Sequence, residues 1–381
     1  MEAVLDQRPP LRLSRRRAVV LLGAGTLGVV SVALLLPALG DLPDTWHRLS
    51  SGDPAWLALA LGLEALSFLG HIVLFRAVSH GASARVNLRA STEITLAGHA
   101  ATRLFASAGA GGVALTAWAL RRSGMERATV AARMTTFLVL LYGVYMAALV
   151  VGGLGLYTGV LSGPAPVALT LVPAAFGAAV IVTALALPHL GGVLERSARL
   201  RRAVPAARAI GAGVEDSLRM LRRGDPGLLG ALLWWGADVA VLWATFQAFG
   251  TPPAFTVLIV AYFVGMLANT LPLPGGVGGV DGGMVGALIA FGVEPELALI
   301  AVLGYRGFAF WLPIVPGAVA YLGLRRTVSR WEREDAGEPA VPSGAWKASV
   351  VSSTTRISSA VSRRWPSRCR APRTSLGPTT P

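Results

Sequence analysis

Apolar segments of about 20 residues recur along the chain and alternate with short polar turns. At 1.5 Å per residue, about 20 apolar residues cross the hydrocarbon core of a bilayer as one helix. The pattern predicts an all-α polytopic membrane protein with about seven full spans and two re-entrant helical segments. We expect the spans at about 18–39, 55–75, 129–152, 165–187, 227–249, 254–271 and 295–323, and the shorter apolar stretches at about 91–120 and 280–291.

The overall composition supports this class. Of the 381 residues, 54% are hydrophobic and only 14% are charged, and the mean hydropathy is +0.60. A soluble domain carries about 25% charged residues. The single cysteine, Cys369, allows neither an intrachain disulfide nor a cysteine-based metal site. The sequence contains no nucleophile–base pattern, zinc-ligand spacing or P-loop, so we expect neither an enzyme nor a bound metal or other cofactor.

The net charge of +14 is concentrated in a few arginine-rich segments. Five arginines lie in residues 1–17 and eight in 191–225, and Arg325 and Arg326 follow the last predicted span. Arginine-rich loops face the cytoplasm. We therefore expect a cytoplasmic (inner) membrane protein with both termini inside. Because orientation accounts for these charges, no nucleic-acid partner is expected.

The charge and apolar patterns also suggest a division of the chain. Residues 1–17 form a basic cytoplasmic N-terminus, 18–326 a transmembrane domain, and 327–381 a disordered cytoplasmic tail rich in Ser, Thr, Pro and Arg. Within the domain, 191–225 is a cytoplasmic amphipathic loop. It is either a solvated loop whose charges set orientation or a helix pair that contacts anionic lipid head groups.

A helix-breaking stretch interrupts the apolar pattern at 271–283. It holds two prolines, six glycines and Asp281. Broken helices inside a membrane are tolerated only against protein or a water-filled cavity, and in transporters they mark binding sites. Its glycines at 275, 276, 278 and 279 either allow close helix packing or expose backbone N–H groups that favour anions. We take Gly275, Gly276, Gly278 and Gly279 as candidate site residues.

The chain also resembles itself. Residues 106–113 align with 273–280, and four positions are identical: Gly109, Gly111, Gly112 and Val113 match Gly276, Gly278, Gly279 and Val280. Arg89 and Arg121 place both ends of the first copy inside, whereas the second copy lies between two outer loops. The two re-entrant segments are therefore predicted to be inverted with respect to each other, as in transporters built from inverted repeats.

Arg306 and Asp281 are the strongest candidates for a polar site. Arg306 follows Pro295 by 11 residues, which places it about 16 Å into a span. A buried arginine there costs about 2.5–3.5 kcal/mol unless it is paired. It forms either a packing ion pair or a contact with a substrate phosphate, which guanidinium geometry suits. Asp281 either caps the short helix that follows or pairs with Arg306.

Other polar residues lie within predicted membrane segments. Glu64 and His71 share one helical face, Asp238 lies in the 227–249 span, and His99 and Arg103 lie in the first re-entrant segment. Each is a candidate functional residue because such groups are costly in hydrocarbon. The adjacent Trp234 and Trp235 are instead predicted to anchor the protein at the membrane interface.

One family shares these motifs. The run Pro274-Gly-Gly-Val-Gly-Gly-Val-Asp281, the pair Tyr305-Arg306 and the segment Trp311-Leu-Pro313 resemble the lysylphosphatidylglycerol synthase transmembrane-region family, or flippase-like domain. The resemblance spans about residues 18–326. It implies a polytopic inner-membrane protein whose synthase-fused members make and flip aminoacylated phosphatidylglycerol. Asp281 stands where the family has Glu, and Arg306 stands at its Arg. No synthase domain is recognised here, so lipid aminoacylation is not expected.

The preferred hypothesis is a lipid flippase that moves a polar-headed lipid, anionic or aminoacylated, across the cytoplasmic membrane. Its partner would be a membrane lipid, either an anionic phospholipid or a polyprenyl-type lipid. Two alternatives remain: a non-transporting accessory or scaffold protein for a cell-envelope enzyme, and a small-solute transporter. A lateral opening would favour a lipid, a closed wet vestibule a solute, and a dry core around Arg306 a scaffold.

Overall fold

A computed structural model describes residues 51–104, 110–196, 204–270, 276 and 278–337. Every regular element in these ranges is a helix, which confirms the all-α prediction. The chain forms two compact units, Met1–Trp331 and Glu332–Pro381, and only 332–337 of the second are described. The first predicted span, the basic N-terminus and most of the tail lie outside the described residues.

Five described segments are long and apolar enough to cross a membrane. They coincide with five predicted spans and comprise α3 (Pro54–Ser79), α6 (Arg127–Tyr157), α7 (Val167–Arg196), η4 with α9 (Pro226–Leu228 and Leu229–Phe249), and the run of α12 (Pro295–Arg306), the π-helical turn η7 (Gly307–Trp311) and α13 (Ile314–Asp335). Asp53 caps α3 by accepting a hydrogen bond from the Ala55 N–H at 2.8 Å. Proline at the first position then preorganises the helix.

The interval 254–271, predicted as a full span, contains a short helix instead. α10 (Phe255–Leu267) has 13 residues and continues only into the 3-10 turn η5 (Ala268–Thr270). Thirteen residues cover about 20 Å, too little for a hydrocarbon core of about 30 Å. α10 packs against α11 (Gly279–Ala290), so the two form a helical hairpin. Apolar length alone did not reveal that the segment turns back.

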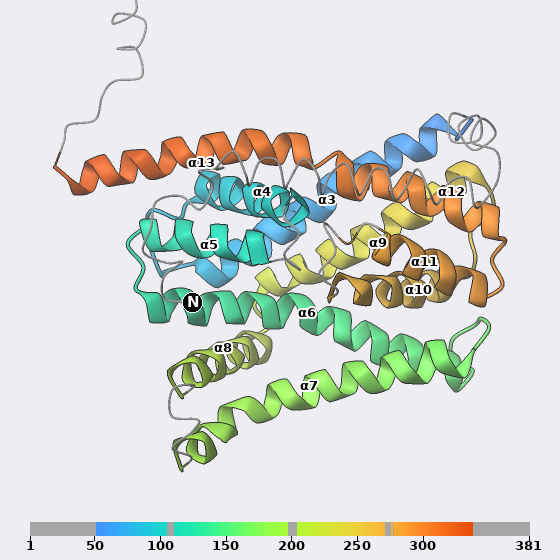
Figure 1. Cartoon of the computed structure of the whole chain (residues 1–381), viewed down its shortest axis with the longest axis horizontal. Coiled ribbons are helices and arrows are strands. Elements are labelled where there is room, and N and C mark those ends of the chain that lie inside the picture. Colours follow the sequence, from blue (N-terminus) through green and yellow to red (C-terminus); the bar gives the residue numbers. More distant parts are fainter. Residues whose placement is uncertain (1–50, 105–109, 197–203, 271–275, 277, 338–381) are drawn as a thin grey trace, which may run out of the picture. The chain divides into compact units, whose positions relative to one another are not determined.

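The first repeat contains an equivalent hairpin, made of α4 (Leu88–Leu104) and α5 (Ala110–Arg122). It follows the C-terminal end of α3, as α10–α11 follows that of α9. α3 and α9 are antiparallel, since the Asp53 N–H donates to the Ala248 carbonyl at 3.0 Å and Gly227 lies against Ala77. The hairpins therefore enter from opposite ends (Figure 1), which confirms the predicted inversion.

α3 and α9 approach each other closely where two glycines meet. A Cβ atom at Gly230 would lie 2.5 Å from the Gly70 carbonyl oxygen. One turn away, the Ser67 hydroxyl donates to the Trp234 carbonyl at 3.0 Å. Small residues at a crossing let helix backbones touch, which is a main source of stability in hydrocarbon.

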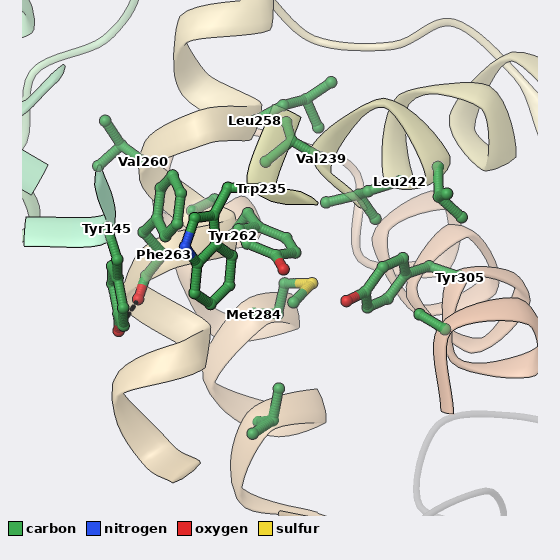
Figure 2. Close-up of a cluster of buried hydrophobic side chains, with 14 of the residues drawn as sticks. Tyr145, Trp235, Val239, Leu242, Leu258, Val260, Tyr262, Phe263, Met284 and Tyr305 are labelled. Atoms are coloured by element: carbon green, nitrogen blue, oxygen red, sulfur yellow. Dashed lines mark hydrogen bonds between the residues drawn. The ribbon is translucent and has the colours of Figure 1, made fainter. Parts of the chain in front are cut away.

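The main core surrounds α9, α10 and α12, and Figure 2 shows its aromatic centre. The Trp235 indole N–H donates to the Leu141 carbonyl at 2.7 Å, and the Tyr145 hydroxyl donates to the Phe263 carbonyl at 2.7 Å. The prediction that Trp234 and Trp235 anchor at the interface is wrong, because both are only 8% exposed. α9 is enclosed by α3, α6, α10 and α12, so its aromatic residues serve the core.

Two further segments refine the predicted boundaries. Residues 191–225 include the end of α7 and the helix α8 (Val204–Arg223), which packs against α6 and α7. Asp216 on α8 pairs with Arg219 and approaches Arg133 of α6 at 3.9 Å. α13 extends to Asp335, so the boundary predicted at 327 falls inside a helix. Thr327 is buried there and donates to Glu93 at 2.7 Å.

Candidate functional site

A cavity of about 580 Å³ lies between the two repeats. At one end it is lined by Ser79 at the end of α3, Leu120 near the end of α5, and Arg133 near the start of α6. At the other end it is lined by Asp238 in the middle of α9 and Arg306 at the end of α12. The cavity therefore runs from one end of the helices to about their middle.

Asp281 and Arg306 form an ion pair beside the deep end. Arg306 Nε lies 2.5 Å from Asp281 Oδ1, and their side chains are only 10% and 18% exposed. The other carboxylate oxygen accepts a hydrogen bond from the Gly278 N–H at 2.9 Å. The sequence left open whether Asp281 caps the helix or pairs with Arg306, and its side chain does both. Aspartate is long enough for the pair, although the family pattern has Glu here.

Backbone geometry fixes the position of Asp281. Asp281 is the third residue of α11, where a carboxylate satisfies a free N–H group and interacts well with the helix dipole. Gly278 precedes the helix with a φ of +81°, and Gly276 has a φ of +68°. Both values favour glycine because a Cβ atom is strained there.

Arg103 reaches the same region from the other repeat. Its Nη2 donates to the Ala309 carbonyl at 2.5 Å, in the π-helical turn that follows Arg306. Its guanidinium carbon lies 5.7 Å from the centre of the Phe68 ring, and the buried Nη1 has no hydrogen-bond partner. Unpartnered buried donors are rare in proteins. Arg103 is also one of the residues that line the cavity.

Two carboxyl groups lie beside the arginines. Asp238 Oδ2 accepts hydrogen bonds from the hydroxyls of Tyr262 and Tyr305, the latter at 3.2 Å. Figure 2 shows both tyrosines pointing their hydroxyls into the space between their helices. Glu64 is 3% exposed, its Oε2 has no hydrogen-bond partner, and its charged neighbours are Asp238 and Arg103. The deep end thus collects charges of both signs.

Aromatic rings line the wall between the two ends. His99 and His71 lie 3.2 Å apart, measured from Nε2 to Nδ1. The His99 ring stacks on Trp234 with centroids 4.8 Å apart, and the His71 ring lies 4.9 Å from Phe137. Within the described ranges, no group of three or more His, Cys, Asp or Glu residues is arranged to hold a metal ion. The arrangement suits a ligand with polar and apolar parts.

The structure brings most of the predicted site residues together. One cluster contains Arg306, Asp281, Asp238, Glu64 and Arg103. Gly276 lines the cavity, Gly278 donates to Asp281, Gly279 begins α11, and Gly275 lies outside the described residues.

Sequence analysis missed many of the residues that line the cavity or bind the buried charges, and three of them show why. Trp234 and Asn269 line the cavity, and Tyr262 binds Asp238. An asparagine just before the helix break is a sequence signal that could have identified Asn269. Tyr262 has no such signal, because a tyrosine in an apolar helix is usually a core residue.

These features define a class: an all-helical, multi-pass membrane protein whose inverted repeats enclose a cavity with buried charges. The chain belongs to the family described as Lysylphosphatidylglycerol synthase TM region, whose pattern matches residues 21–317. It is similar to a UPF0104 membrane protein of Methanothermobacter thermautotrophicus, with 25% identity over 323 residues that cover 78% of this chain and 94% of the relative. Another match of the same description and organism has 33% identity over 104 residues, 26% of this chain and 30% of the relative.

Proposed function

We propose that the protein moves a lipid with an anionic head group across the membrane through this cavity. The observation that carries the proposal is the unpartnered Arg103 Nη1 at a deep end that Arg306 also lines. Hydrogen bonds between a guanidinium and phosphate oxygens are among the strongest in proteins. The oxygens of a phosphate-containing head group can accept the hydrogen bond for which this buried donor has no partner.

A lateral opening supports a lipid rather than a soluble solute. Val113 of α5 and Tyr142 of α6 both line the cavity, and 41% and 47% of their surfaces are accessible to solvent. This accessibility supports an opening of the cavity toward the bilayer between these helices. An acyl chain can remain in the bilayer there while its head group enters. A cavity of about 580 Å³ is also within the usual range for small-ligand sites, about 300–1,000 Å³.

The arginine distribution gives the proposal a direction of access. Ser79, Leu120 and Arg133 lie at the end that the positive-inside rule assigns to the cytoplasm. In this conformation the site accepts a head group from the cytoplasmic leaflet. A cavity at Arg306 also argues against the scaffold alternative, which requires a dry core.

Transport of labelled lipids in vesicles reconstituted with the full chain tests this function. We expect tail-labelled phosphatidylglycerol to exchange between leaflets faster than phosphatidylcholine with the same label. Replacing Arg103→Gln removes a charged donor worth about 1.5–3 kcal/mol, so phosphatidylglycerol exchange should slow about 10- to 100-fold. Arg89→Gln is the matched control, because Arg89 lies on the same helix, pairs with Glu93 and is 71% exposed. Equal rates for both lipids, or for both variants, would contradict the proposal.

Closing the lateral opening tests the route. In a Cys369→Ser background, Val113→Cys and Tyr142→Cys joined by a bifunctional maleimide should reduce lipid exchange at least tenfold. The reason is that the acyl chain can no longer pass between α5 and α6. Each single-cysteine variant treated with the same reagent serves as a control. Undiminished exchange after cross-linking verified by mass spectrometry would exclude this route.

A further inference from the structure

The carboxyl groups of Glu64 and Asp238 are unlike the other charged groups at the deep end. Asp281 has Arg306 as its partner, and Asp238 accepts from two tyrosine hydroxyls. Glu64 is only 3% exposed, and its Oε2 accepts no hydrogen bond. An ionised carboxylate oxygen without a donor is costly at this depth. A protonated Glu64 instead carries a donor of its own.

A count of the charges at the deep end also favours one bound proton. Among the residues that the structure describes, the deep end contains three carboxyl groups, Glu64, Asp238 and Asp281, and two guanidinium groups, Arg103 and Arg306. With every group ionised the cluster carries one net negative charge. One proton held between Glu64 and Asp238 makes it neutral. Two adjacent carboxyl groups in a buried site commonly share one proton for this reason.

The groups that face this pair come from several helices. His71 on α3 and His99 on α4 lie further along the same wall. Arg103 on α4 attracts both carboxyl groups electrostatically. Asp238 also accepts hydrogen bonds from Tyr262 on α10 and Tyr305 on α12, and it is attracted by Arg306 on α12. Asp281 on α11 is occupied by Arg306. Of the carboxyl groups described in this cluster, Glu64 and Asp238 are the two without a guanidinium bonded to them.

We infer that Glu64 and Asp238 form a proton-binding site that couples anion movement to a proton gradient; the inference rests on the proposed function. An anionic head group that binds Arg103 adds one negative charge to the cluster. A second proton from water, which forms an O–H bond on the pair, restores neutrality. Anion and proton therefore bind cooperatively, each increasing the affinity for the other by the same factor. Release of the head group on the far side releases the proton with it.

Vesicles containing the full chain test the coupling. An imposed gradient of one pH unit should enrich tail-labelled phosphatidylglycerol in the leaflet facing the alkaline side, by up to about tenfold at one proton per charge. Coupling is thermodynamic, so mixed orientations in the vesicles do not change its direction. Glu64→Gln should abolish the enrichment. Glu93→Gln should retain it, since Glu93 is a buried carboxyl on α4 that already binds Arg89 and Thr327.

A binding measurement separates failure of the coupling from failure of transport. We expect the full chain in detergent to bind glycerophosphoglycerol, a phosphodiester with one fixed negative charge, with uptake of about one proton, measured by calorimetry in two buffers of different ionisation enthalpy. Glu64→Gln, with its fold verified by thermal unfolding, should take up none. Lipid exchange that is insensitive to the pH gradient overturns the inference but not the proposed function. Absence of lipid exchange overturns the proposed function. In that case the calorimetry tests the proton-binding site by itself, and no binding, or binding without proton uptake, overturns the inference as well.

Discussion

Replacing Arg306→Ala should lower the stability of the protein by about 3 kcal/mol and reduce lipid exchange at least 100-fold. The substitution leaves Asp281 without its cation in a site that is largely buried. Removing one partner of a buried ion pair costs about 3–5 kcal/mol, and the partial exposure of this pair favours the lower value. The substitution also removes the stacking of the guanidinium over Phe310 at 4.5 Å. Thermal unfolding in detergent and the vesicle assay measure the two effects.

A double-mutant cycle distinguishes the pair from the cap. Asp281→Asn retains an oxygen for the Gly278 N–H but removes the charge, so it should lose most of the pairing energy and little of the cap. If the pair dominates, the double variant is no less stable than Arg306→Ala alone. Arg306→Lys, which keeps a charge, should be intermediate. Additive losses would show that the two residues act separately.

Replacing Gly230→Ala should destabilise the protein by about 3 kcal/mol, at the upper end of the usual cost of overpacking. The new Cβ atom would lie 2.5 Å from the Gly70 carbonyl oxygen and 2.7 Å from the Leu74 nitrogen. These are backbone atoms of α3, so no side chain can rotate away. Because Glu64 lies on α3 and Asp238 on α9, separation of the helices should also reduce transport.

The same helix offers a matched control. A Cβ atom at Gly236 has no neighbour within 4 Å, so Gly236→Ala should change stability by less than about 0.5 kcal/mol. Thermal unfolding of both variants in one detergent makes the comparison. A Gly230→Ala protein as stable as Gly236→Ala would mean that α3 and α9 can move apart without cost.

Hydrophobic length was sufficient to predict the five long spans that the structure describes, and the arginine distribution with the internal repeat predicted that the α4–α5 and α10–α11 hairpins are inverted. The depth of Arg306 in its span likewise predicted a polar partner, and Asp281 is that partner. The spans and the depth of Arg306 are local features, because they depend on how many apolar residues precede a charge, whereas the inversion could be predicted because the chain repeats its own sequence.

Features that depend on contacts between distant segments could not be predicted. Residues 254–271 are as apolar as a span, and their return as a hairpin depends on packing between α10 and α11. Trp234 was assigned to the interface because its residue type is common there, whereas the structure packs it against His71 and His99. The link between Asp238 and Tyr262 joins residues 24 positions apart on separate helices.

Position 281 has consequences for how the sequence can drift. Its side chain must accept from the Gly278 N–H and also neutralise Arg306. Serine, threonine and asparagine meet the first requirement but bring no charge. Aspartate and glutamate meet both requirements. Substitutions tolerated at this position are therefore confined to exchange between these two residues, which differ by one methylene group.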